Sequence, residues 1–111
     1  MARRERRHPR QLVADWPRPE KSRVAIEKWE GVSDKPHDER LVAPARATRQ
    51  IVINLRDAMG ESSIREVAEL CGLDHSQVLR ILNGELWPDA ISITKLEDGL
   101  GVDLWPRRLD R

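Results

Sequence analysis

The chain has 111 residues, a length that allows one domain and at most a short additional segment. Its 20 lysine and arginine residues balance 19 aspartate and glutamate residues, so the formal net charge of +1 indicates no class of partner. Hydrophobic residues make up 39% and charged residues 35% of the chain, which is typical of a soluble protein with a small core. No apolar run reaches the roughly 18–20 residues of a membrane span, no signal peptide opens the chain, and one cysteine excludes an internal disulfide framework. We therefore expect a cytoplasmic protein without a membrane segment.

The composition changes near Pro44. Five of the seven prolines lie at or before this position, and apolar residues are sparser before it than after it. We therefore expect three parts: an N-terminal arm and helical extension (1–43), a core domain (44–105) and a C-terminal tail (106–111).

A short amphipathic segment lies in the N-terminal part. Between Pro19 and Glu30, Ile26 and Trp29 share one face at helical spacing, and Gly31 is a natural stop. A helix of this length is marginal alone. We expect it to pack through Ile26 and Trp29 on its own core or, alternatively, on a second copy of the chain.

The first core helix is predicted between Pro44 and Met59. Pro44 suits the first helical position, and Gly60 suits the left-handed residue that ends a helix. Its apolar side chains fall on one helical face. They are Ile51, Val52, Leu55, Ala58 and Met59.

A second helix follows after a short turn. Ser63 and Glu66 form a capping box, in which the serine closes the first turn and the glutamate reaches back. Gly72 ends the helix. Its buried stripe consists of Ile64, Val67, Ala68 and Cys71.

A third helix begins almost at once, because only Leu73 separates Gly72 from a new cap at Asp74. Gln77 stands three residues after this cap, where a capping box has its second partner. The helix spans residues 74–83 and ends at Asn83-Gly84. Its buried stripe consists of Val78, Ile81 and Leu82.

A fourth helix is predicted after a cap at Asp89, with Gly101 as its stop and Trp105 closing the bottom of the core. Its inward residues are Ala90, Ile93, Leu96 and Leu100. No segment shows the sustained alternation of a strand. The expected fold class is all-α, a bundle of four to five short helices with an N-terminal helical extension.

Two short helices joined by a glycine-containing turn of three to four residues describe a helix-turn-helix. Residues 63–102 also resemble the Cro/phage-repressor type of helix-turn-helix, the XRE family, without a gap over about 40 residues. With the first core helix included, the resemblance covers residues 44–105. The matching positions are Ala68, Gly72, Val78, Ile81, the Arg80–Gly84 ending, Pro88 and Leu100–Val102. The resemblance implies a repressor-like bundle that binds double-stranded DNA.

The chain departs from the family in three respects. Ile64 stands where the family usually has glutamine, and Glu85 stands where lysine or arginine is frequent. Residues 61–102 carry three basic and eight acidic residues, a net charge of −5. Since much of the affinity for DNA comes from phosphate neutralisation, positive charge from other segments must flank the motif. Arg46, Arg49 and residues 1–10, with five arginines and one glutamate, supply it.

The exposed face of the third helix is the expected reading surface. It lies opposite the buried stripe and is expected to hold His75, Ser76, Gln77, Leu79, Arg80 and Asn83. In the major groove, Gln77 pairs with adenine, Arg80 with guanine or phosphate, and Leu79 touches a thymine methyl group. The alternative interpretation of this face is an ordinary solvated surface.

Two further expectations about DNA binding concern the N-terminal arginines and the oligomeric state. Arg3, Arg4, Arg6 and Arg7 form either an arm that enters the minor groove or a solvated tail. Proteins of this family commonly read two-fold symmetric sites, so a homodimer is expected.

Other chemistry is not indicated. His75 is near Asp74 and Cys71, which are read as a cap and a core residue, so no metal site, cofactor or catalytic group is expected and the protein is not predicted to be an enzyme. The leading interpretation is a sequence-specific DNA-binding transcriptional regulator. The alternative is a protein-interaction module, antitoxin-like or an adaptor, on the same scaffold, which the acidic motif region favours.

Overall fold

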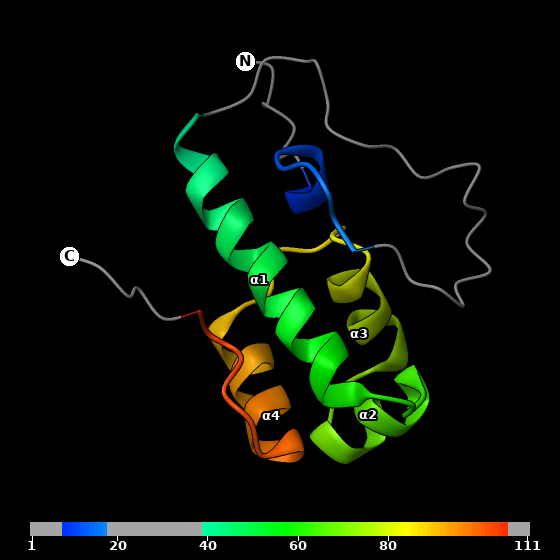
Figure 1. The fold of residues 1–111 in the computed structure, drawn as a ribbon. Helices are drawn as coiled ribbons and strands as arrows, with labels where there is room; N and C mark the ends of the chain where they lie inside the picture. Colours follow the sequence, from blue (N-terminus) through cyan, green and yellow to red (C-terminus); the bar gives the residue numbers. More distant parts are fainter. Residues whose placement is uncertain (1–7, 18–38, 107–111) are drawn as a thin grey trace, which may run out of the picture.

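The structure is a computed structural model that describes residues 8–17 and 39–106. This part of the chain contains helices and turns but no strand, which confirms the all-α class (Figure 1). Its elements are η1 (Pro9–Gln11), η3 (Glu39–Leu41), α1 (Val42–Met59), α2 (Ile64–Cys71), α3 (His75–Leu82) and α4 (Ala90–Leu100). The expected helix between Pro19 and Glu30 lies outside the described residues, as do Arg3, Arg4, Arg6 and Arg7.

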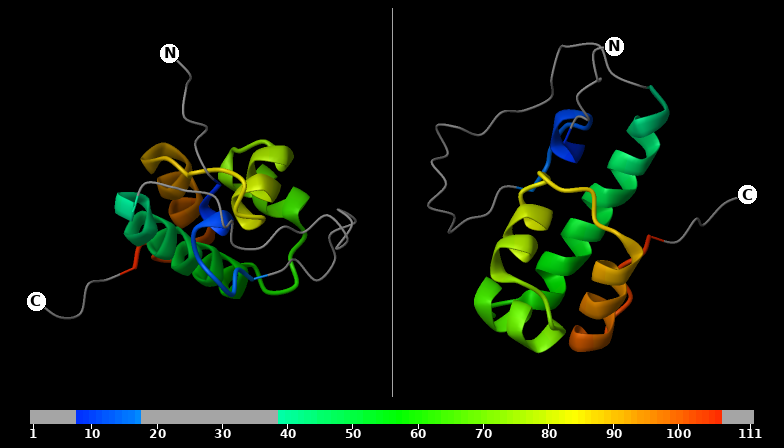
Figure 2. Two further views of the ribbon diagram at one scale, coloured as in Figure 1. Left: turned by 90° about the horizontal axis from the view of Figure 1, so that it is seen from above. Right: turned by 180° about the vertical axis from the view of Figure 1, so that it is seen from behind.

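The long helix α1 crosses the shorter helices, which pack on one another, since α2 contacts both α3 and α4 (Figures 1 and 2). It begins at Val42, two residues before the predicted start at Pro44, and continues from the turn η3. Pro44 is tolerated at the third helical position because the first four N–H groups of a helix have no intrahelical partner. None of the helices in the described ranges combines the length and hydrophobicity of a membrane span.

The α2–α3 pair has the predicted local chemistry at its first cap. Ser63 Oγ accepts a hydrogen bond from the N–H of Glu66 at 3.1 Å, and Glu66 Oε1 accepts one from the N–H of Ser63 at 3.5 Å. Gly72 adopts the left-handed conformation with φ +71°, and the chain turns directly into α3. The helix boundaries of this pair therefore follow from local sequence.

The caps of α3 and α4 differ. Asp74 is the N-cap of α3, as predicted, but its side chain makes no capping hydrogen bond. Asp89 Oδ1 does accept a hydrogen bond from the N–H of Ser92, at 2.7 Å, and Gly101 ends α4 in the left-handed conformation. Gln77 does not reach back to the cap of α3 and has another partner, described below.

The core agrees with most of the predicted apolar stripes, although Ala58, Met59 and Ile64 are only half-buried. Ala90, predicted inward, is exposed, and Leu100 is only half-buried. Trp105 does not close the bottom of the core, because 48% of it is exposed and the preceding Leu104 is buried. Glu97 holds the backbone of these two residues in place, since its Oε2 accepts hydrogen bonds from the N–H groups of Leu104 and Trp105 at 2.7 and 3.4 Å.

Residues 8–17 pack onto the same core, and we call this segment the strap. Leu12, Val13 and Trp16 are all buried in it. The strap lies beside α1 and over the C-terminal end of α3 (Figures 1 and 2). Arg49 of α1 holds it from one side, donating from Nη1 to the carbonyl of Ala14 at 2.7 Å.

Candidate nucleic-acid interface

The outward face of α3 is formed by its first two turns. His75, Ser76 and Arg80 are exposed, and Leu79 is half-buried between them. The opposite side of the helix is fully used in packing, since Val78, Ile81 and Leu82 are buried. Four of the six predicted reading residues therefore share one accessible surface.

Gln77 is turned away from this surface. Its Nε2 donates to the hydroxyl of Ser92 at 2.7 Å, and Ser92 is buried at the start of α4. The N–H of Ser92 donates in turn to Asp89. The backbone and side-chain hydrogen bonds from Ser92, helped by the charge of Lys95, lower the pKa of Asp89. Gln77 thus fastens α3 to the N-terminal cap of α4.

Asn83 does not belong to the exposed face either. Only 2% of it is exposed, and its carbonyl accepts a hydrogen bond from Arg10 Nη1 of the strap at 3.1 Å. The prediction that Asn83 is exposed is therefore wrong, because a segment more than 70 residues earlier in the chain covers that end of α3.

The strap is the part of this region that sequence reasoning missed. Trp16 Nε1 donates to the carbonyl of Leu82 at 3.0 Å, and His8 and Arg10 contact the turn after α3. A signal was present, since Leu12, Val13 and Trp16 are apolar at the i, i+1, i+4 spacing of one helical face.

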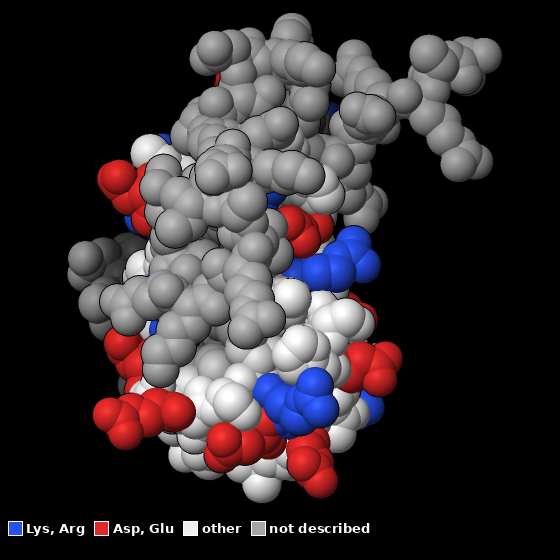
Figure 3. Space-filling view, turned by 90° about the vertical axis from the view of Figure 1, so that its right-hand side faces the viewer, with Lys and Arg blue, Asp and Glu red and all other residues white. Residues whose placement is uncertain are grey.

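The charges around α3 are mixed. The described residues carry a net charge of −4, but α3 itself contains Arg80 and no acidic residue. Glu85, just after α3, forms an ion pair with Arg10 at 3.2 Å. Figure 3 shows the side on which α2 and α3 lie, where acidic and basic groups are interspersed with uncharged surface among the described residues. The residues of α3 therefore add no negative charge to this surface.

Metal and thiol chemistry find no support in the part of the chain that the structure describes. No group of three or more His, Cys, Asp and Glu side chains there is arranged to hold a metal ion. Cys71 is buried, its Sγ donates to the carbonyl of Leu96 at 3.9 Å, and burial raises the pKa of this thiol. A raised pKa keeps the thiol protonated and unreactive.

Two short helices joined through a glycine turn, the second with an accessible polar face, define a helix-turn-helix protein. Residues 54–104 match the family model described as helix-turn-helix, which agrees with the resemblance of residues 63–102 to the Cro/phage-repressor type, the XRE family. No curated protein and no solved structure matches the chain. The domain places the protein among DNA-binding helix-turn-helix regulators, a class that is not typically enzymatic.

Proposed function

We propose that this protein is a cytoplasmic transcriptional regulator that binds double-stranded DNA in a sequence-specific way, with α3 in the major groove. One observation carries the proposal: the second helix of the motif presents His75, Ser76, Leu79 and Arg80 on an accessible face that contains no acidic side chain. The N-terminal residues of a recognition helix are those that reach base edges.

Each of these side chains suits a different contact with the bases of DNA. The Arg80 guanidinium donates two hydrogen bonds to O6 and N7 of a guanine, and the Ser76 hydroxyl pairs with a donor or an acceptor. Leu79 contacts a thymine methyl group. Gln77 and Asn83 are engaged in the protein, so we assign them no base contact.

The N-terminal arginines provide positive charge that the motif lacks. The strap begins at His8, whose Nδ1 lies 2.6 Å from the carbonyl oxygen of Glu85, just beyond α3. Seven residues precede His8, and a fully extended chain of this length spans at most about 25 Å. We propose that Arg3, Arg4, Arg6 and Arg7 contact phosphates or the adjacent minor groove.

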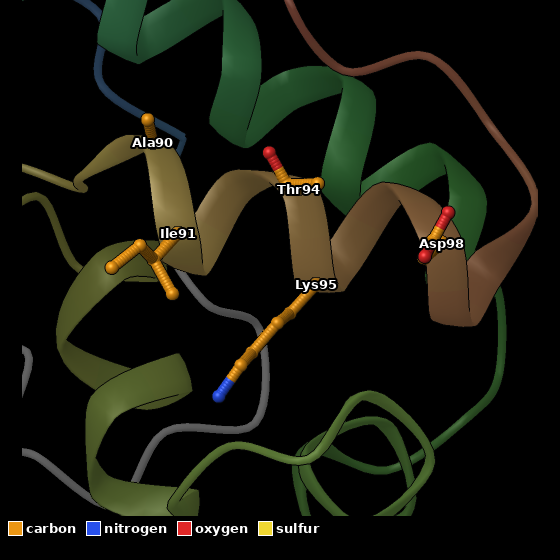
Figure 4. Close-up of a pocket in the computed structure, with 5 residues that line it drawn as sticks. All are labelled: Ala90, Ile91, Thr94, Lys95 and Asp98. Atoms are coloured by element: carbon orange, nitrogen blue, oxygen red, sulfur yellow. The ribbon is translucent and has the colours of Figure 1, made fainter.

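A homodimer fits a two-fold symmetric site with recognition helices about 34 Å apart. The outer face of α4 offers a surface for a second copy (Figure 4). It has a shallow hollow lined by Ala90, Ile91, Thr94, Lys95 and Asp98, and 69% of Ile91 is exposed. In Figure 4, Ile91 and Lys95 point to one side of the helix and Thr94 and Asp98 to the other.

Selection from a pool of random duplexes tests the function. The wild-type chain should enrich one motif, and Arg80→Ala should lose about 1–3 kcal/mol of discrimination at particular base pairs. Arg65→Ala, an exposed arginine of α2, is the matched control and should leave the motif unchanged. A chain without residues 1–7 should bind all duplexes more weakly and with a smaller salt dependence. A wild type that enriches no motif would refute DNA reading.

The alternative is a protein-interaction module that uses the same scaffold. Two observations favour it: residues 61–102 have a net charge of −5, and Leu70 on α2 is 64% exposed. The selection experiment separates the two functions, because an interaction module has no preferred duplex.

A further inference from the structure

The strap closes the C-terminal end of α3 with a continuous set of hydrogen bonds. The last carbonyl groups of a helix have no intrahelical partner. Within the turn, the N–H groups of Gly84 and Glu85 satisfy the carbonyls of Ile81 and Arg80 at 3.1 and 3.0 Å. The next four carbonyls, 82 to 85, all have partners in the strap.

These four contacts come from three strap residues. Trp16 Nε1 donates to the carbonyl of Leu82 at 3.0 Å, and His8 Nδ1 to that of Glu85 at 2.6 Å. Arg10 supplies the other two, from Nη1 to the carbonyl of Asn83 at 3.1 Å and from its backbone N–H to that of Gly84 at 3.2 Å. The strap therefore acts as a cap made by a distant segment.

Gly84 allows the strap to come this close. It has φ +68°, and a Cβ there would lie 2.6 Å from the Trp16 ring and 2.7 Å from Cβ of Arg10. Any side chain at this position would push the strap away from α3.

The contact between the strap and the turn after α3 also brings a positive charge beside a negative one. Glu85 stands just beyond the C-terminus of α3, where a negative charge opposes the helix dipole. Arg10 lies 3.2 Å from its carboxylate, with side chains only 12% and 28% exposed, and places a positive charge at that end. Glu85 is thus one of the residues that hold the strap on this end of α3.

We propose that the strap is a positioning element for DNA recognition and that the Arg10–Glu85 pair is the contact through which it acts on Arg80. The inference rests on the proposed function. Arg80 is joined to the turn directly, because its carbonyl accepts the N–H of Glu85. Gln77 fixes the other end of α3 to α4. A helix of only eight residues held at both ends presents Arg80 in one orientation, which bidentate base pairing requires.

The test uses charge exchange in the full chain. Arg10→Glu and Glu85→Arg each break the pair, and the double variant restores it with the wild-type net charge. For each protein, the affinity for the selected duplex and for a scrambled duplex is measured at one salt concentration. The temperature is kept well below the melting temperature of every variant. Each single variant should lower the ratio of the two affinities about tenfold, within the range of one lost base contact. The double variant should recover part of it, because the ion pair returns but the hydrogen bond to the carbonyl of Asn83 does not.

Two further variants separate positioning from stability. Glu85→Gln keeps the shape of the residue and should lower the ratio in the same direction. Leu104→Ala opens a cavity in the core beside α1 and α4, away from the strap and α3, and should lower the melting temperature without changing the ratio. The preference lost in Arg10→Glu should be at the base pair that Arg80→Ala affects.

The outcomes are distinct. If the wild type selects a duplex but both charge reversals keep its ratio, or if the double variant recovers none of the loss, the strap is not a positioning element and the proposed function stands. If the wild type prefers no duplex, the proposed function fails and this inference fails with it.

Discussion

Gln77 donates its side-chain hydrogen bond to Ser92 across the α3–α4 contact, at 2.7 Å, although it stands on the helix expected to read DNA. Ser92 is buried and is also bonded through its N–H to Asp89, the residue that caps α4. The position of α3 in the domain is therefore coupled to the cap of the next helix. Gln77 was predicted to pair with adenine, but its side chain instead holds α3 against α4.

A double-mutant cycle on this pair should show direct coupling. Gln77→Ala leaves the buried hydroxyl of Ser92 without its donor, so it should lower the free energy of unfolding by about 1–3 kcal/mol. Once Ser92 is alanine, the same change should cost less, with a coupling energy of about 0.5–1.5 kcal/mol. Urea denaturation of the four proteins gives these values, and strictly additive effects would show that the two side chains do not interact in solution.

The cap of α4 should make stability depend on pH in acid. Hydrogen bonds from Ser92 lower the pKa of Asp89 in the folded chain, so its carboxylate stabilises the fold above its ordinary pKa of about 4. This contribution is lost as the pH falls through the lower, folded-state value. Asp89→Asn retains a capping acceptor but does not titrate. The melting temperature of the wild type should exceed that of the variant near neutral pH, and the gap should close in strong acid. A gap that does not change with pH would contradict the assignment.

The helices were predictable because their signals are local. The capping residues Ser63 and Asp89 and the left-handed glycines Gly72 and Gly101 act within a few residues of their own positions. Hydrophobic periodicity then gives the buried side of each helix. The helix start predicted at Pro44 was two residues too late, because proline is accepted anywhere in the first turn and does not mark its first position.

The candidate site was less predictable, because its accessible residues depend on distant segments. Asn83 has the right helical phase for the outward face, yet the strap covers it through contacts more than 70 residues away in sequence. Trp105 and Leu104 follow the last helical stop, so periodicity no longer tells which of them points inward. Glu85 looked unfavourable for a DNA surface until its partner Arg10 was placed beside it.

Gly99→Ala should destabilise the domain although alanine favours helix formation. A Cβ at this position would lie 2.5 Å from Sγ and 3.0 Å from the backbone Cα of Cys71 on α2. Overpacking costs about 1–3 kcal/mol, whereas the gain in helix propensity is only about 1 kcal/mol. Adding Cys71→Ala removes the sulfur contact but not the backbone one, so it should recover part of the loss.

The matched control for this substitution is Asp98→Ala, the exposed neighbour on α4. It gains helix propensity and removes a negative charge from the C-terminal turn without a steric conflict. Its melting temperature should equal or exceed that of the wild type. If Gly99→Ala also melts higher, the close contact between α2 and α4 is not present in solution.

The last prediction concerns the outer face of α4. Ile91 is the most exposed large hydrophobic residue of the described chain, at 69%, and stands beside Lys95 on the hollow of this helix. Because one helix face buries less than the roughly 1,200 Å² of a standard interface, the dimer without DNA should be weak and visible only at high protein concentration. Sedimentation over a concentration series should show association of the wild type and its loss in Ile91→Asp. Leu70→Asp, which places the same charge at a 64% exposed position on α2, should associate normally. A wild type that stays monomeric throughout, or an Ile91→Asp variant that associates as well as the wild type, would exclude this face as the dimer contact.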